Sequence, residues 1–92
     1  MTFFSVLTEV AEERRRQDNL WGEQNHEPSI WSMILTEEVG ELCEAMNRHY
    51  FGASTPKEFA KAIEDMREEA IQVAAVATAF IEALDRNKGW PT

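Results

Sequence analysis

Residues 36–46 read TEEVGELCEAM, and this stretch decides the fold that we predict for the chain. An α-helix turns by about 100° per residue, which places four apolar residues along one side in the spacing of a buried stripe: Leu35, Val39, Leu42 and Met46. Glu38 then lies about 60° to one side of the stripe, and Glu41 about 60° further in the same direction. The stretch therefore predicts a helix with two carboxylates at the edge of its core face.

Carboxylates at the edge of a core lose hydration, and neighbouring carboxylates also repel each other. A hard divalent cation relieves both effects because it takes carboxylate oxygens as ligands. Glu-rich faces are also common on solvated helices, so this short motif alone is weak evidence for a metal site. A second helix with a matching arrangement would favour the metal.

Residues 55–58 predict the start of a long helix, with Thr55 as N-cap, Pro56 at the first helical position and Glu58 closing a capping box. Eight apolar residues follow at alternating spacings of four and three: Phe59, Ile63, Met66, Ala70, Val73, Ala77, Phe80 and Leu84. We expect this helix to end near residues 86–88, with Gly89 and Pro91 beyond it. Because so long an apolar stripe exceeds what one small chain covers, we expect a second chain to complete it.

The second helix repeats the acidic arrangement of the first. Glu69 lies about 60° from its stripe and Gln72 about 60° further, the same displacement as for Glu38 and Glu41, and Asp65 lies between them in angle. A short connection favours antiparallel packing, which lets the two acidic edges converge. Mg²⁺ held by several carboxylates binds phosphates and can activate water, so the pattern points to hydrolysis of a phosphoanhydride.

The N-terminal residues 2–18 predict an amphipathic helix whose second half is charged. For its three arginines, Arg14, Arg15 and Arg16, solvated charge is a better explanation than phosphate binding. A loop of about ten residues follows, and Ser29 is a plausible N-cap for the helix that continues to about Tyr50.

The loop concentrates planar polar and aromatic side chains: Trp21, Gln24, Asn25 and His26. Such groups can stack on a heterocycle and form hydrogen bonds with it. The alternative is that Trp21 fills the core while Asn25 and His26 shape the turn. The spacing alone does not separate these two interpretations.

Length and composition predict one domain spanning residues 1–92. The net charge of −8 disfavours binding to polymeric nucleic acid or to an anionic membrane, whereas it suits divalent cations. The single cysteine, Cys43, is expected to be a small core residue. No signal peptide or membrane-spanning stretch is visible, so we expect a cytoplasmic protein.

The acidic pattern resembles that of a known family. Glu37-Glu38-x-x-Glu41, followed by Glu69-x-x-Gln72, looks like the EExxE…ExxD pattern of the MazG-like, all-α nucleotide pyrophosphohydrolases. Residues 16–18 (RQD) and 21–26 (WGEQNH) are similar to a loop of small bacterial and phage members. With residues 67–86, REEAIQVAAVATAFIEALDR, the resemblance covers nearly the whole chain.

The resemblance implies hydrolysis of a (deoxy)nucleoside triphosphate to the monophosphate and pyrophosphate, with Mg²⁺ or alternatively Mn²⁺. It implies an all-α bundle of three to four helices completed by dimerisation, as a homodimer or a dimer of dimers. By position, Glu38, Glu41 and Glu69 are metal ligands. Glu37 assists a further ion or, like Glu38, orients the attacking water.

The chain departs from the family at Gln72, where aspartate is usual. An amide oxygen can ligate Mg²⁺ but brings no charge, so the number and affinity of the ions change. Asp65 could supply the missing carboxylate from one turn earlier. Including Gln72 and Asp65, the predicted metal ligands are therefore five.

The resemblance also reaches the loop, and it favours base and sugar contacts by Trp21, Gln24, Asn25 and His26. Three cations could bind phosphates: Lys57, Lys61 and Arg67. The competing interpretation is that each cation pairs in solvent with a nearby acid.

The sequence thus predicts a Mg²⁺-dependent nucleoside triphosphate pyrophosphohydrolase. The alternative is a non-catalytic or weakly active helical dimer that binds a nucleotide or a protein partner, with its chemistry impaired by Gln72. A purely structural interaction module would explain the long apolar stripe but not the matched acidic edges.

Overall fold

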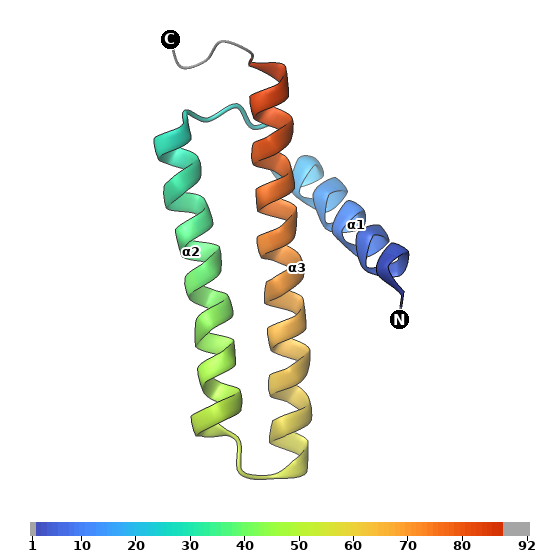
Figure 1. The fold of residues 1–92 in the computed structure, drawn as a ribbon, viewed down its shortest axis with the longest axis vertical. Coiled ribbons are helices and arrows are strands. Elements are labelled where there is room, and N and C mark those ends of the chain that lie inside the picture. Colours follow the sequence, from blue (N-terminus) through green and yellow to red (C-terminus); the bar gives the residue numbers. More distant parts are fainter. Residues whose placement is uncertain (1, 88–92) are drawn as a thin grey trace.

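The computed structural model describes residues 2–87. In this range the chain forms α1 (Phe3–Trp21), α2 (Pro28–Asn47), a π-helical turn η1 (Arg48–Gly52) and α3 (Pro56–Arg86). Helices α2 and α3 lie antiparallel as a long hairpin, and α1 packs across α3 (Figure 1). The predicted all-α architecture is confirmed for this range, whereas the expected Gly89 and Pro91 beyond the last helix lie outside the described residues.

The start of α3 follows the capping chemistry of its sequence. The Thr55 hydroxyl accepts a hydrogen bond of 3.1 Å from the Glu58 backbone N–H, and Pro56 is the first helical residue. The Ser54 hydroxyl donates to the Glu58 carboxylate at 3.1 Å. These bonds satisfy donors that the first helical turn otherwise leaves unpaired, so the helix begins where the sequence predicts.

The loop between α1 and α2 is shorter than predicted. Helix α1 continues to Trp21 and stops at Gly22, whose φ of 72° is readily adopted only by glycine. Helix α2 begins at Pro28, with Glu27 rather than Ser29 at the N-cap position. Proline suits the first helical position because its φ is preset and no N–H is needed there. Only residues 22–27 therefore form the loop.

The end of α2 also differs from the prediction. The α-helix ends at Asn47, and residues Arg48–Gly52 continue as a single π-helical turn. The chain then turns through residues 53–55 into α3. Tyr50 and Phe51 lie on this turn at the tip of the hairpin, each 79% exposed.

The core of the chain lies at the end of the hairpin where the α1–α2 loop passes. Trp31 is 2% exposed and packs with Val76, Ala79 and Ala83. The sequence analysis did not identify Trp31 as a core residue. Its signal is the seven-residue spacing of Trp31, Glu38 and Ala45, which places all three on one face of α2.

The predicted apolar stripes coincide only in part with the faces that pair within the hairpin: Leu35 and Phe80 pack against the core cluster, whereas other stripe residues are exposed. Val39 is 40% exposed and Ile63 52% exposed, whereas the preceding Ala62 is buried and Ala45, just before the stripe residue Met46, is fully buried. Small side chains let two helix backbones approach closely, so the alanine positions turn inward. Both helices are therefore rotated relative to the prediction by less than the roughly 100° of one full residue, so only part of each stripe faces the other helix.

This rotation also corrects the prediction for Cys43, which is exposed rather than part of the core. Cys43 precedes the inward Ala45 by two residues, which is about 160° around the helix. The thiol consequently lies on the outer side of α2.

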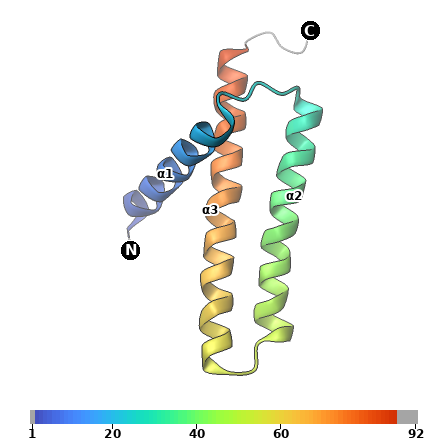
Figure 2. The same ribbon diagram turned by 180° about the vertical axis from the view of Figure 1, so that it is seen from behind.

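The two sides of the hairpin have different neighbours. In an antiparallel pair, residues that follow the inward positions lie on the same side, which we call the open face: Val39, Met46, Phe59 and Ile63. Helix α1 lies on the other side, the groove face, because Arg14 of α1 binds Glu82, which precedes the inward Ala83. Figure 2 shows that α1 crosses α3 and that the N-terminal end of α1 lies on the side away from α2.

Among residues 2–87, no helix combines the length and apolar character that crossing a bilayer requires.

Candidate functional site

Three carboxylates from two helices meet in the groove between α2 and α3. One oxygen from each of Glu38 and Glu41 on α2 and Glu69 on α3 lies within 4.8 Å of the others. The sequence analysis predicted that these three residues converge, and the antiparallel hairpin brings them together. Their role as metal ligands stays a prediction.

Burial leaves this group without compensating partners. The Oε2 atoms of Glu38 and Glu69 are both buried and accept no hydrogen bond. Lost hydration raises the pKa of Glu38, and the charges of Glu41 and Glu69 raise it further. The pKa of Glu69 is raised by the same loss of hydration and then by Glu41, while the charge of Arg48 opposes the shift. The group thus favours a bound proton or a bound cation.

A cavity of about 290 Å³ adjoins the carboxylate group on the groove face. Helices α1, α2 and α3 all contribute to its wall, and we call it the tryptophan cavity. Five of the predicted site residues line it: Trp21, Gln24, Glu37, Glu38 and Gln72. Glu37, which the resemblance implies assists a further ion or orients the attacking water, lies on this wall.

The two candidates for a fourth oxygen ligand lie in different places. Gln72 lines the tryptophan cavity beside Glu38. Asp65 binds Lys61 at 2.8 Å and lines a separate cavity at the hairpin tip. Asp65 is not part of the converging group, so the geometry gives no support to the idea that it replaces the missing carboxylate.

The predicted base-contact residues divide into two pairs. Trp21, which is 60% exposed, and Gln24 line the tryptophan cavity. Asn25 instead accepts a hydrogen bond of 3.1 Å from Arg86 Nε, and the His26 ring lies edge-on to Trp31 with centroids 5.2 Å apart. Asn25 and His26 therefore hold the loop against the end of α3 and the core.

Arg86 is a structural residue that the sequence analysis missed. Its guanidinium also donates to the Gln24 carbonyl at 3.0 Å and pairs with Glu23 at 2.7 Å. The sequence analysis placed the end of the helix near this residue and gave it no other role. That it anchors a loop some 60 residues earlier in the chain is not visible from local sequence.

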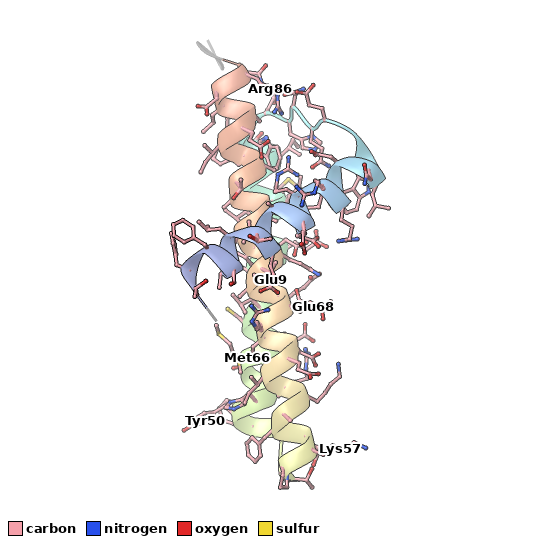
Figure 3. All side chains as sticks on the ribbon, turned by 90° about the vertical axis from the view of Figure 1, so that its right-hand side faces the viewer. Glu9, Tyr50, Lys57, Met66, Glu68 and Arg86 are labelled. Atoms are coloured by element: carbon pink, nitrogen blue, oxygen red, sulfur yellow. The ribbon has the colours of Figure 1, made fainter. Side chains whose placement is uncertain are left out.

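Two of the three predicted phosphate-binding cations, Lys61 and Arg67, have acidic partners in the structure, whereas Lys57 forms no ion pair with the described residues. Lys61 binds Asp65, as described above, and Arg67 of α3 forms a two-pronged ion pair with Glu9 of α1. In Figure 3 Glu9 and Glu68 are labelled where α1 crosses α3. The Arg67–Glu9 and Arg14–Glu82 pairs join α1 to α3 at two points.

No protein-family model, curated protein or solved structure matches the chain. The resemblance to MazG-like proteins therefore rests on the sequence motifs alone.

Proposed function

We propose that the protein is a Mg²⁺-dependent nucleoside triphosphate pyrophosphohydrolase of the MazG-like kind, releasing the monophosphate and pyrophosphate. The observation that carries this proposal is the convergence of Glu38, Glu41 and Glu69 within 4.8 Å in the hairpin groove.

The chemistry of the group favours a hard divalent cation. All donors are carboxylate oxygens, and Mg²⁺ and Mn²⁺ prefer such ligands over the nitrogen and sulfur sets typical of zinc. Two of these carboxylates have buried oxygens without hydrogen bonds, an arrangement that costs free energy until a cation or a proton arrives. A bound Mg²⁺ would neutralise the developing charge on phosphate oxygens.

The adjoining tryptophan cavity offers the remaining parts of a nucleotide site. Trp21 presents a flat ring for stacking, and the amides of Gln24 and Gln72 can both donate and accept hydrogen bonds. Glu37 lies on the same wall and can accept a proton from the attacking water. The water oxygen then bonds to the α-phosphorus while the bond to the bridging oxygen breaks, and pyrophosphate leaves with that oxygen.

The active molecule in this proposal is a homodimer or a dimer of dimers. The open face exposes Val39, Met46, Phe59 and Ile63 in the single chain, all by 39% or more. Contiguous apolar residues of this kind mark association surfaces, and a second copy presents the same stripe. Because α1 lies on the opposite side, a partner on the open face leaves the groove accessible.

A second candidate function is nucleotide binding without turnover. Gln72 favours it, since an uncharged amide stands beside Glu38 where the resemblance implies a fourth carboxylate. Fewer charges weaken Mg²⁺ binding and with it the stabilisation of the transition state.

Pyrophosphate release from a panel of nucleoside triphosphates, with and without Mg²⁺, tests the first proposal. Glu38→Gln and Glu69→Gln should each lower turnover at least about 100-fold, equivalent to about 2.7 kcal/mol in the activation barrier. Glu64→Gln is the matched control because Glu64 is exposed on the same helix as Glu69. Wild-type turnover in both site variants would contradict the proposal.

The second candidate gives a different result. A nucleotide would then raise the melting temperature of the wild-type protein while no pyrophosphate appears. If the panel of nucleotides gave no stabilisation and no pyrophosphate release, both functions would be excluded.

A further inference from the structure

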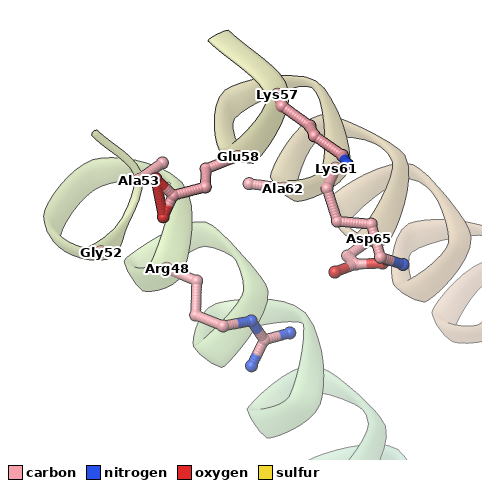
Figure 4. A pocket seen from close by; sticks show the side chains of 8 residues that line it. All are labelled: Arg48, Gly52, Ala53, Lys57, Glu58, Lys61, Ala62 and Asp65. Carbon is pink, nitrogen blue, oxygen red and sulfur yellow. The ribbon is translucent and has the colours of Figure 1, made fainter. Parts of the chain in front are cut away.

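Three cations line a second cavity, at the tip of the hairpin. This tip cavity has a volume of about 390 Å³ and lies between the end of α2, the turn η1 and the first turns of α3 (Figure 4). Arg48, Lys57 and Lys61 line it, together with Glu58 and Asp65. Three of the nine lysines and arginines of this acidic chain therefore meet at one cavity.

Two of the three tip cations, Arg48 and Lys57, are less firmly paired than Arg14, Arg16 and Arg86. Arg14, Arg16 and Arg86 form ion pairs of 2.8, 2.6 and 2.7 Å. Arg48 lies 3.7 Å from its nearest carboxylate partner, and no carboxylate of the described range lies within 4.0 Å of Lys57. An incoming anion thus meets two cations that need not first release a tightly bound partner.

Both acidic residues of the tip cavity already have a hydrogen-bond or ion-pair partner. Glu58 accepts the Ser54 hydroxyl and belongs to the cap of α3, and Asp65 is paired with Lys61 at 2.8 Å. The N-terminus of the 31-residue α3 adds a positive partial charge at the same place. Three cations against two carboxylates leave the side chains of the lining with a formal net charge of +1, to which the helix N-terminus adds.

The carboxylate group lies between the two cavities along the groove. Asp65, at the tip cavity, precedes Glu69 by four residues, which is about 6 Å along the helix. On the other side, Glu38 belongs both to the carboxylate group and to the wall of the tryptophan cavity. Arg48 lies near enough to Glu69 for its charge to counter the rise in the pKa of that carboxyl, which burial and Glu41 cause.

We propose that the tip cavity binds the phosphates that leave as pyrophosphate, through Arg48 and Lys57, so that the nucleotide lies along the groove with its base in the tryptophan cavity. That the ligand is the phosphates of the substrate rests on the proposed function. That the tip cavity binds an anion of the phosphate type is independent of that function.

Titration calorimetry with inorganic pyrophosphate, in EDTA so that no divalent cation takes part, tests the anion site directly. Arg48→Gln and Lys57→Gln should each weaken binding about fivefold, and the double variant by more than about tenfold. Arg15→Gln removes the same charge from an exposed position on α1 and should bind as the wild type does. Unchanged affinity in the double variant, or no binding by the wild-type protein, would overturn the proposal.

Further measurements identify which class of anion binds, and they distinguish failure of the anion site from failure of the proposed enzyme activity. Citrate tests for any polyanion, and inorganic phosphate tests for a single phosphate group; affinity equal to that of pyrophosphate for either would overturn a site for pyrophosphate. In turnover assays, Arg48→Gln and Lys57→Gln should raise the KM for the triphosphate. Absence of turnover combined with Arg48-dependent pyrophosphate binding would reject the enzyme but keep the anion site.

Discussion

The groove face and the open face of the α2–α3 hairpin lie on opposite sides of the inward positions of the two helices. Glu38 and Ala62 take inward positions, and the residues that follow them, Val39 and Ile63, lie on the open face. The groove face carries the carboxylate group and the two cavities, and the open face carries an apolar stripe. The comparison teaches that the apolar periodicity of this chain serves two surfaces, since Leu35 and Phe80 pack in the core whereas Val39 and Ile63 lie on the open face.

Replacing Trp31 should have the largest effect, because this side chain of α2 packs in the buried core cluster against α3. Trp31→Ala removes a ring that is 2% exposed and packs against Phe80 and His26, with ring centroids 5.8 and 5.2 Å away. We expect the free energy of unfolding in urea to fall by about 3–5 kcal/mol. Trp21→Ala, at a 60% exposed position, is the control and should cost less than about 1 kcal/mol. Equal losses would mean that Trp31 does not organise the core.

A charge on the open face should act on self-association and leave the groove unaffected. Ile63→Glu, at a position 52% exposed in the single chain, should raise the dissociation constant of the dimer at least tenfold, about 1.4 kcal/mol, as measured by sedimentation. Ile81→Glu is the matched control because Ile81 is 57% exposed on the same helix but lies about 160° from the inward Ala83. A wild-type protein that sediments as a monomer would contradict the open face as a dimer surface.

The smallest effect we expect is the pH dependence of the groove. Because the pKa values of Glu38 and Glu69 are raised in the folded chain, folding favours their protonated forms. Their contribution to stability without metal is complete below the ordinary glutamate pKa and is lost as the pH rises through the raised values. Thermal melts of wild type and Glu38→Gln between these limits should therefore diverge as the pH rises, with the variant becoming the more stable.

Other carboxylates act in the opposite direction, so the difference between the two proteins is the informative quantity. Glu9 and Glu13 bind arginines that lower their pKa values, and their contribution is lost as the pH falls. Adding Mg²⁺ at neutral pH should stabilise the wild type more than Glu38→Gln. Identical pH profiles for the two proteins would show that neither lost hydration nor the neighbouring charges raise the pKa of Glu38.

Much of the candidate site could be predicted because it depends on periodicity within each helix. The spacing of Glu38, Glu41 and Glu69 predicted three carboxylates in one place, and the geometry agrees. The loop was harder, since Asn25 owes its position to Arg86 and His26 owes its position to Trp31. Those contacts join distant segments or depend on how a ring packs, and no local pattern encodes them.

By itself, the sequence determined where the helices form, how α3 begins and which residues share a helix face, because capping bonds and helical periodicity involve neighbours along the chain. The tertiary structure alone decided the rotation of α2 and α3 about their axes, the side on which α1 lies and the position of the two cavities. Those features depend on how the volume of Trp31 fits against Ala79 and Ala83, and on ion pairs such as Arg14 with Glu82. The sum of many weak contacts between distant residues sets that fit, so a partial rotation left part of the expected core stripe on the open face.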